Sequence, residues 1–195
     1  MENIKQLIQA ENKLIAILHK RLSSKRMNHT LNVAQTAAEL AAVNQINCKK
    51  AVKAGLLHDY ARELSSDELL ILAKEAKWPF HPMEQHIPIL LHGPVAAYLV
   101  NRDLKISDQQ ILKAIQYHTT GCPGMDKLSQ IVYIADMIEP GRNYEGVEKL
   151  RHLAYEDLRT AFLQCLEHSI FYIIKQGGLL HPLTVEARND LILTK

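Results

Sequence analysis

The sequence predicts an all-α protein built as a single domain. Apolar residues recur at helical spacing from one end of the chain to the other, and no segment shows the sustained alternation that strands need. The 195 residues are 47% hydrophobic and 23% charged, which is ordinary for a globular protein with a sizeable core. We expect one helical bundle of about eight to ten helices over residues 1–195.

The first half of the chain divides into helices and one irregular segment. Apolar stripes predict the first three helices, over residues 4–18, 24–43 and 49–62. The run Ser65–Glu68 is a capping-type start for a helix through about residue 76. Prolines at 79 and 82 then break the pattern, so residues 78–93 should cross the bundle irregularly.

The second half is helical in the same way. Gly93 and Pro94 start a helix to about residue 101, with the proline near its first position. Ser107 and Asp108 open a helix that runs to His118, and residues 120–124 form a loop. Further helices are expected near 127–138, 145–154, 156–175 and 184–192.

Composition excludes several classes of protein. The balance of 23 Lys+Arg against 21 Asp+Glu argues against bulk binding to nucleic acid. No apolar stretch reaches the roughly 18 residues of a membrane span, and the N-terminus lacks the pattern of a signal peptide. The cysteines at 48, 122 and 165 form no disulfide framework. We therefore expect a cytoplasmic protein with neither nucleic acid nor membrane as partner.

Four polar side chains occupy places where apolar ones are expected. Asp136 is the only charge in the run 131–138, and His58 and Asp59 follow an apolar helix. His29 shares a helical face with apolar residues of the preceding segment. Taken singly, each could be a structural or surface residue. Together, two imidazoles and two carboxylates are a ligand set for a divalent metal, with positions left for water and a substrate oxygen. That arrangement suits metal-assisted hydrolysis.

The order His29, His58-Asp59, Asp136 resembles the HD-domain phosphohydrolases. Further segments look like the bacterial YqeK-type family over nearly the whole chain: Arg26–Thr30, Gly55–Arg62, His92–Ala97, Ala114–Gly121 and Tyr133–Arg142. The resemblance implies symmetrical hydrolysis of diadenosine tetraphosphate to two ADP, with iron at the HD site. It also implies a metal-binding core over about 20–140, with helices over 145–195 completing the bundle and pocket. Without the resemblance, composition and residue spacing predict only a metal-dependent phosphohydrolase. Its nitrogen and oxygen ligands would accept Mn, Co, Ni or Zn as well as iron.

Two further histidines have three interpretations. His118 ends an apolar helical face, and His92 precedes a helix start, where free N–H groups favour anions. They could contact phosphate or donate a proton, bind a second metal, or be structural. The resemblance favours the first, so we expect one metal ion and count a second as the lesser alternative. Asp59, expected also to orient the attacking water, and Arg62 join His92 and His118 as candidate catalytic residues.

The phosphates should meet basic and polar side chains near the metal. Arg62 lies at i+4 from His58, where a guanidinium suits phosphate. Arg142 and Tyr144 follow Asp136 in a loop that could cover the distal phosphates or the base, against the alternative of an ordinary polar loop. The other candidate substrate contacts are Arg26, Asp59, Tyr60, His92, His118 and Thr119.

Other functions remain as alternatives. The first is a general HD-type nucleotide phosphohydrolase, such as a nucleotidase or (d)NTP hydrolase. A second is a nucleotide sensor that binds without reacting, and a third is a plain helical adaptor. A homodimer would suit the apolar stripe near the C-terminus, formed by Leu163, Leu166, Ile170, Ile173 and Ile174.

Overall fold

A computed structural model describes residues 3–194 and confirms the all-α fold. Within that range it contains twelve α-helices, one short 3₁₀ helix and no strand. The helices are α1 (Ile4–Ala10), α2 (Asn12–Arg21), α3 (Ser24–Val43), α4 (Cys48–Leu57), α5 (Ser66–Glu75), α6 (Pro82–His86), α7 (His92–Leu104), α8 (Gln109–Tyr117), α9 (Lys127–Ile138), α10 (Val147–Glu156), α11 (Leu158–Lys175) and α12 (Pro182–Leu193), with η1 (Pro88–Leu91) before α7.

Three elements differ from the sequence-based expectation. The first predicted helix is divided into α1 and α2, because the helical conformation is interrupted at Glu11. The irregular segment before α7 contains α6 and η1. The helix expected over 49–62 ends at Leu57, and residues 58–64 form successive turns, with hydrogen bonds from Arg62 N to Asp59 O (2.9 Å) and from Tyr60 N to Leu57 O (3.1 Å).

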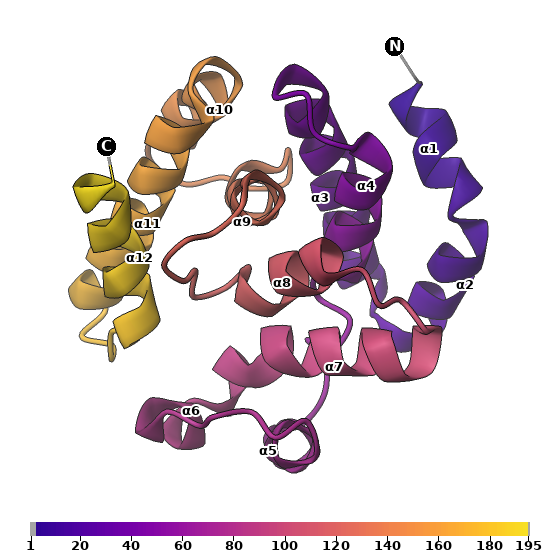
Figure 1. The fold of residues 1–195 in the computed structure, drawn as a ribbon, viewed down its shortest axis with the longest axis horizontal. Coiled ribbons are helices and arrows are strands. Elements are labelled where there is room, and N and C mark those ends of the chain that lie inside the picture. Colours follow the sequence, from indigo (N-terminus) through magenta and orange to yellow (C-terminus); the bar gives the residue numbers. More distant parts are fainter. Residues whose placement is uncertain (1–2, 195) are drawn as a thin grey trace.

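Helix α9 runs through the middle of the molecule and is seen end-on in Figure 1. The α3–α4 pair packs on one side of it, α10 and α11 pack on another, and α12 packs against α11. Helix α8 joins α9 and α4 to α7, while α5 and α6 lie beyond α7 (Figure 1). Helices α3, α4 and α8 therefore pack on α9, and α7 packs on α8.

The core fills the space between these helices. Its largest fully buried side chains include Tyr133 of α9, Phe162 of α11 and Leu57 of α4. The Tyr133 and Phe162 rings meet edge to face at 5.2 Å, which ties α9 to α11. Among residues 3–194, no helix combines the length and apolarity required to cross a bilayer.

The α3–α4 contact is close because its residues are small. Ala34, Ala38 and Ala41 are fully buried on α3, and Gly55 of α4 faces Ala34. A Cβ added at Gly55 would lie only 2.7 Å from the Cα of Ala34. The missing side chain thus lets the two backbones approach, and it brings the end of α4 up to the middle of α3.

Candidate active site

The four predicted ligands converge. His29 stands on α3, His58 and Asp59 follow the last residue of α4, and Asp136 lies near the end of α9. His29 Nε2 is 3.1 Å from Asp136 Oδ1 and 3.6 Å from Asp59 Oδ2. His58 Nε2 is 3.3 Å from the same Asp59 oxygen. Three distant segments therefore place two imidazoles and two carboxylates around one point.

The helix ends orient three of the histidines. His58, His92 and His118 each stand at the C-cap of a helix, where carbonyls of the last turn can accept from a side chain. Their Nδ1 atoms face the carbonyl three residues back, at 2.7 Å for Gly55, 2.5 Å for Ile89 and 2.7 Å for Ile115. Since a carbonyl only accepts, each Nδ1 carries the proton, and a neutral ring then presents a bare Nε2.

The chemistry of these atoms suits a metal. Within residues 3–194, the buried Nε2 atoms of His29 and His58 have no hydrogen-bond partner. Such atoms are costly to bury unless something binds them. An ion held by Nε2 lone pairs and carboxylate oxygens would satisfy them, and the set His29, His58 and Asp59 lies close enough together to share one.

A second set of side chains meets the other oxygen of Asp59. Asp59 Oδ1 is 3.3 Å from His92 Nε2 and 3.9 Å from His118 Nε2. Those two nitrogens are 2.9 Å apart, and the Thr119 hydroxyl lies 3.2 and 3.1 Å from them. A hydroxyl donates to one nitrogen only. The hydroxyl therefore satisfies only one of the two Nε2 lone pairs, whereas a cation ligated by both nitrogens would satisfy the pair.

Both carboxylates are anionic at neutral pH. Burial would raise the pKa of Asp59, yet the neighbouring His58 and His92 rings hold it well below its usual value. Burial likewise opposes ionisation of Asp136, but the neighbouring His29 and His58 rings and the Arg142 guanidinium lower its pKa. Burial, with His92 nearby, lowers the pKa of His118 to about 3, so its ring is neutral.

Two arginines border the cluster. Arg26 Nη1 donates to Asp59 Oδ2 at 2.8 Å, and Arg142 Nη2 donates to Asp136 Oδ1 at 2.5 Å. Both guanidinium groups line a groove of about 520 Å³ beside the cluster, together with Lys25 and Tyr144. The Tyr144 hydroxyl donates to the Met137 carbonyl at 2.9 Å, and its ring lies 4.5 Å from that of His168.

Among the described residues, the side chains of two predicted substrate contacts, Tyr60 and Arg62, make no hydrogen bond or ion pair with the four predicted ligands. Tyr60 is only 4% exposed, and its ring is covered by the Arg21 guanidinium at 4.2 Å. Arg62 is half-buried in the turns after α4, so the helical i+4 argument that placed it beside His58 does not apply. No hydrogen bond or ion pair joins its side chain to another described residue, and Arg26 occupies the position beside Asp59.

Sequence reasoning missed Glu139. This carboxylate is 3% exposed and lies 3.1 Å from His29 Nδ1. It directly follows the apolar run 131–138 that singled out Asp136, so the signal was present one residue further along the chain. Its contact with α3 spans 110 residues and could not be deduced from spacing.

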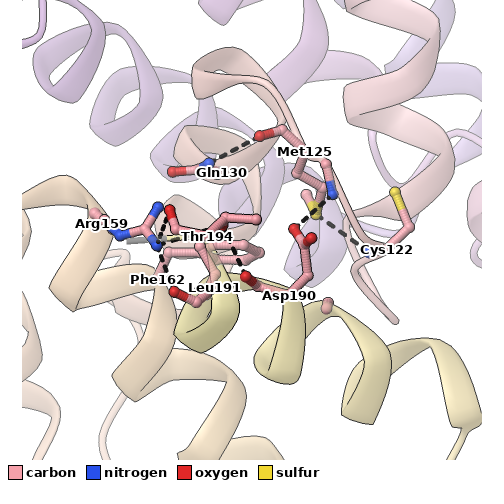
Figure 2. A pocket seen from close by; sticks show the side chains of 10 residues that line it. Cys122, Met125, Gln130, Arg159, Phe162, Asp190, Leu191 and Thr194 are labelled. Atoms are coloured by element: carbon pink, nitrogen blue, oxygen red, sulfur yellow. Dashed lines mark hydrogen bonds between the residues drawn. The ribbon is translucent and has the colours of Figure 1, made fainter.

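A second cavity lies apart from the cluster. It holds about 230 Å³ between the loop after α8 and helices α11 and α12 (Figure 2). Its polar groups bond to one another: Gly124 N donates to Asp190, Gln130 donates to the Met125 carbonyl, and Arg159 donates to the Leu191 carbonyl. Burial raises the pKa of Cys122 to about 11, so its thiol is protonated. These groups leave little polar chemistry for a ligand.

Comparison with known proteins gives concordant matches. The model of the HD domain family matches residues 26–141. A protein of Bacillus subtilis named symmetrical bis(5'-nucleosyl)-tetraphosphatase is 38% identical over 178 residues, covering 91% of this chain and 95% of its own. One of the same name from Staphylococcus aureus is 31% identical, covering 87% and 88%. The crystal structure of a predicted HD superfamily hydrolase involved in NAD metabolism, from Clostridium acetobutylicum, superposes with a TM-score of 0.92 at 39% identity, covering 95% of this chain and 98% of that one.

Proposed function

The chain belongs to the HD domain family, among the symmetrical bis(5'-nucleosyl)-tetraphosphatases, and we infer from this that it hydrolyses diadenosine tetraphosphate to two ADP in a metal-dependent reaction. The observation that carries the chemistry is the convergence of His29, His58, Asp59 and Asp136. A general nucleotide phosphohydrolase is not favoured, because the relatives named symmetrical bis(5'-nucleosyl)-tetraphosphatase match over almost their full length.

We propose that His29, His58, Asp59 and Asp136 hold a divalent transition metal. The family resemblance supports iron, although the same nitrogen and oxygen donors suit other first-row ions. When bound, the ion polarises a phosphoryl oxygen and supplies a water of lowered pKa. Asp59 directs Oδ2 at His29 and His58 and Oδ1 at His92 and His118. It would therefore also orient a water or phosphate oxygen bound between these two pairs of histidines.

The tautomers favour metal ligation by His92 and His118 over proton donation. Each ring uses its Nδ1 proton on a backbone carbonyl, and a neutral ring has no proton left on Nε2 for a phosphate oxygen. With Asp59, the two nitrogens form a set close enough to bind one ion. We therefore propose a second cation position there, which revises the phosphate-contact role expected from the resemblance.

The groove beside the cluster would receive one half of the dinucleotide. Arg26, Arg142 and Lys25 border it and would neutralise phosphate charge. Tyr144 offers an aromatic ring for a base to stack on, which is typically worth about 1–3 kcal/mol. A groove fitted to one ADP unit would place the cluster between the second and third phosphates, and cleavage there gives two identical products.

We extend the proposal to the partner, the cellular location and the oligomeric state of the protein. The partner is a small nucleotide rather than a macromolecule, and we propose that the protein acts on it in the cytoplasm. The homodimer also stays a prediction: Ile174 in the expected stripe is exposed, as are Phe171 and Tyr172 beside it, whereas Leu166 belongs to the core.

Product analysis tests the proposed activity. Purified protein is incubated with diadenosine tetraphosphate and a divalent metal, and the nucleotides are separated by chromatography, with a chelator-treated sample alongside. We expect ADP as the sole product and no reaction after chelation. ATP together with AMP would refute the symmetrical register, and hydrolysis of mononucleotides at equal efficiency would favour a general phosphohydrolase.

A further inference from the structure

The buried carboxylate of Glu139 lies next to His29, one of the four proposed metal ligands, and the proposed reaction gives it no role. Glu139 follows the last residue of α9 and is 3% exposed. Its Oε1 faces His29 Nδ1 at 3.1 Å, while its Oε2 accepts from Asn32 Nδ2 at 2.9 Å and from Gly141 N at 2.6 Å. One side chain thus links the His29 ring to Asn32 of α3 and to the backbone of Gly141.

His29 needs this partner because of its place in its helix. The other three histidines of the cluster, His58, His92 and His118, lie at helix ends and donate to backbone carbonyls. His29 lies in the interior of α3, which runs from Ser24 to Val43, and the carbonyls around it belong to helical hydrogen bonds. Only a side chain from elsewhere in the fold can fix its ring.

We propose that Glu139 is a positioning residue that holds His29 in the tautomer able to bind metal. The carboxylate accepts the Nδ1 proton, so Nε2 keeps its lone pair toward Asp59 and Asp136. A ligating histidine paired with a carboxylate is also more basic than one paired with a neutral group. The proposal rests on the metal-dependent function proposed above.

The substitution Glu139→Gln tests the tautomer directly. Oε2 accepts two hydrogen bonds, one of them from the backbone of Gly141, so the glutamine oxygen is best placed there. Its amide nitrogen then faces His29 Nδ1 and donates to it. The ring must move its proton to Nε2, and that atom can no longer bind metal. The side chain keeps its size and two of its three bonds.

The chain offers a matched control in Glu84. It too is a buried carboxylate, 2% exposed, that accepts from a side chain (Trp78 Nε1, 3.1 Å) and from a backbone N–H (His81, 2.8 Å). Glu84→Gln therefore reproduces the loss of a buried charge away from the cluster. Gly141→Ala provides a second variant, because its Cβ would lie 2.9 Å from Glu139 Oε1 and displace the carboxylate without neutralising it.

The measurements are the imidazole ¹⁵N–¹H spectrum of metal-free protein at alkaline pH and a titration with Co²⁺. We expect His29 to be protonated at Nδ1 in wild type and at Nε2 in Glu139→Gln. The Co²⁺ affinity should fall by about 10–100-fold in Glu139→Gln, fall in Gly141→Ala, and stay near wild type in Glu84→Gln.

Several results would overturn the proposal. One is an unchanged His29 tautomer with unchanged affinity in Glu139→Gln. Another is an equal loss of affinity in Glu84→Gln, which would mean that any buried charge has the same effect. Wild-type protein that binds no metal would instead overturn the proposed function, so the two failures are distinguishable.

Discussion

At the scale of single residues, the donor set depends on which ring nitrogen each histidine leaves free. Backbone carbonyls fix that choice for His58, His92 and His118, while Glu139 faces the corresponding nitrogen of His29. The sequence indicated the residue types, because charges and imidazoles interrupt apolar helices. It could not indicate hydrogen bonds such as Arg26 to Asp59, which join α3 to the turns after α4.

His58 provides the most direct residue test. His58→Ala removes a fully buried imidazole whose Nε2 faces Asp59. The loss of hydrolysis should exceed the roughly 10–100-fold that removal of an outer partner costs, because a ligand itself is lost. Steady-state kinetics with diadenosine tetraphosphate measure this. His152→Ala, at an exposed histidine of α10, should change nothing. Near-normal activity in His58→Ala would remove it from the proposed ligand set.

Arg142 tests the phosphate groove. Arg142→Lys keeps the positive charge but loses the fork that now bonds the Asp136 carboxylate and carbonyl together. Hydrogen bonds to charged groups contribute about 1.5–3 kcal/mol, so kcat/KM should fall roughly 10-fold or more. Kinetics at saturating metal isolate the effect of substrate. A variant that responds only to metal concentration would place Arg142 in the metal site alone.

At the scale of elements, local signals predicted helix starts better than helix ends. The capping box of Ser65 with Glu68 and the Asp108 cap lie where the sequence placed them. The end of α4 at Leu57 was missed because the residues that follow, such as Ala61 and Arg62, suit a helix equally well. Contacts with other parts of the fold, including Arg26 with Asp59, stabilise the turns instead.

Gly55 tests the α3–α4 contact. Gly55→Ala would force α4 away from Ala34, and such overpacking typically costs about 1–3 kcal/mol. Thermal unfolding should show a lower Tm together with weaker metal binding, since His58 follows three residues later. Gly178→Ala, in the loop before α12, meets a side-chain methyl of Ile173 first and should cost less. Equal effects of the two substitutions would contradict this account of the packing.

A substitution at Glu84 tests whether its charge stabilises the segment before α7, which contains α6. Burial opposes its ionisation, but hydrogen bonds from His181, the His81 backbone and Trp78 lower its pKa below the usual value of a glutamate. A carboxylate with a depressed folded pKa adds stability above its unfolded pKa and loses it as pH falls through the folded pKa. The Tm of Glu84→Gln should therefore lie below that of wild type at pH 7, and the gap should narrow below about pH 4. A gap independent of pH would contradict a role for the charge.

At the scale of the whole molecule, the cluster joins helices that lie far apart in the sequence. His29, His58 and Asp136 come from α3, the end of α4 and α9, and His92 and His118 add α7 and α8. Residue chemistry and the family resemblance predicted this convergence, whereas hydrophobic periodicity could not, because it says which face of a helix is buried and not which helix that face meets.

Metal should therefore stabilise the entire fold. At 100 times its Kd a ligand adds about 2.7 kcal/mol, which for a chain of this size raises Tm by roughly 5–10 °C. Differential scanning calorimetry with and without Co²⁺ measures the shift, and a chelator should reverse it. Asp136→Asn should abolish most of the rise. An unchanged wild-type Tm at saturating Co²⁺ would contradict a site that spans these helices.

Hydrolysis in ¹⁸O-labelled water tests the central claim most directly, because it locates the bond that is cleaved. The products are separated after a single turnover with diadenosine tetraphosphate and metal, then weighed by mass spectrometry. Attack by water on an inner phosphorus predicts ADP only, with half of the molecules carrying one ¹⁸O on the terminal phosphate. Label in AMP or ATP, or unlabelled ADP throughout, would contradict the account.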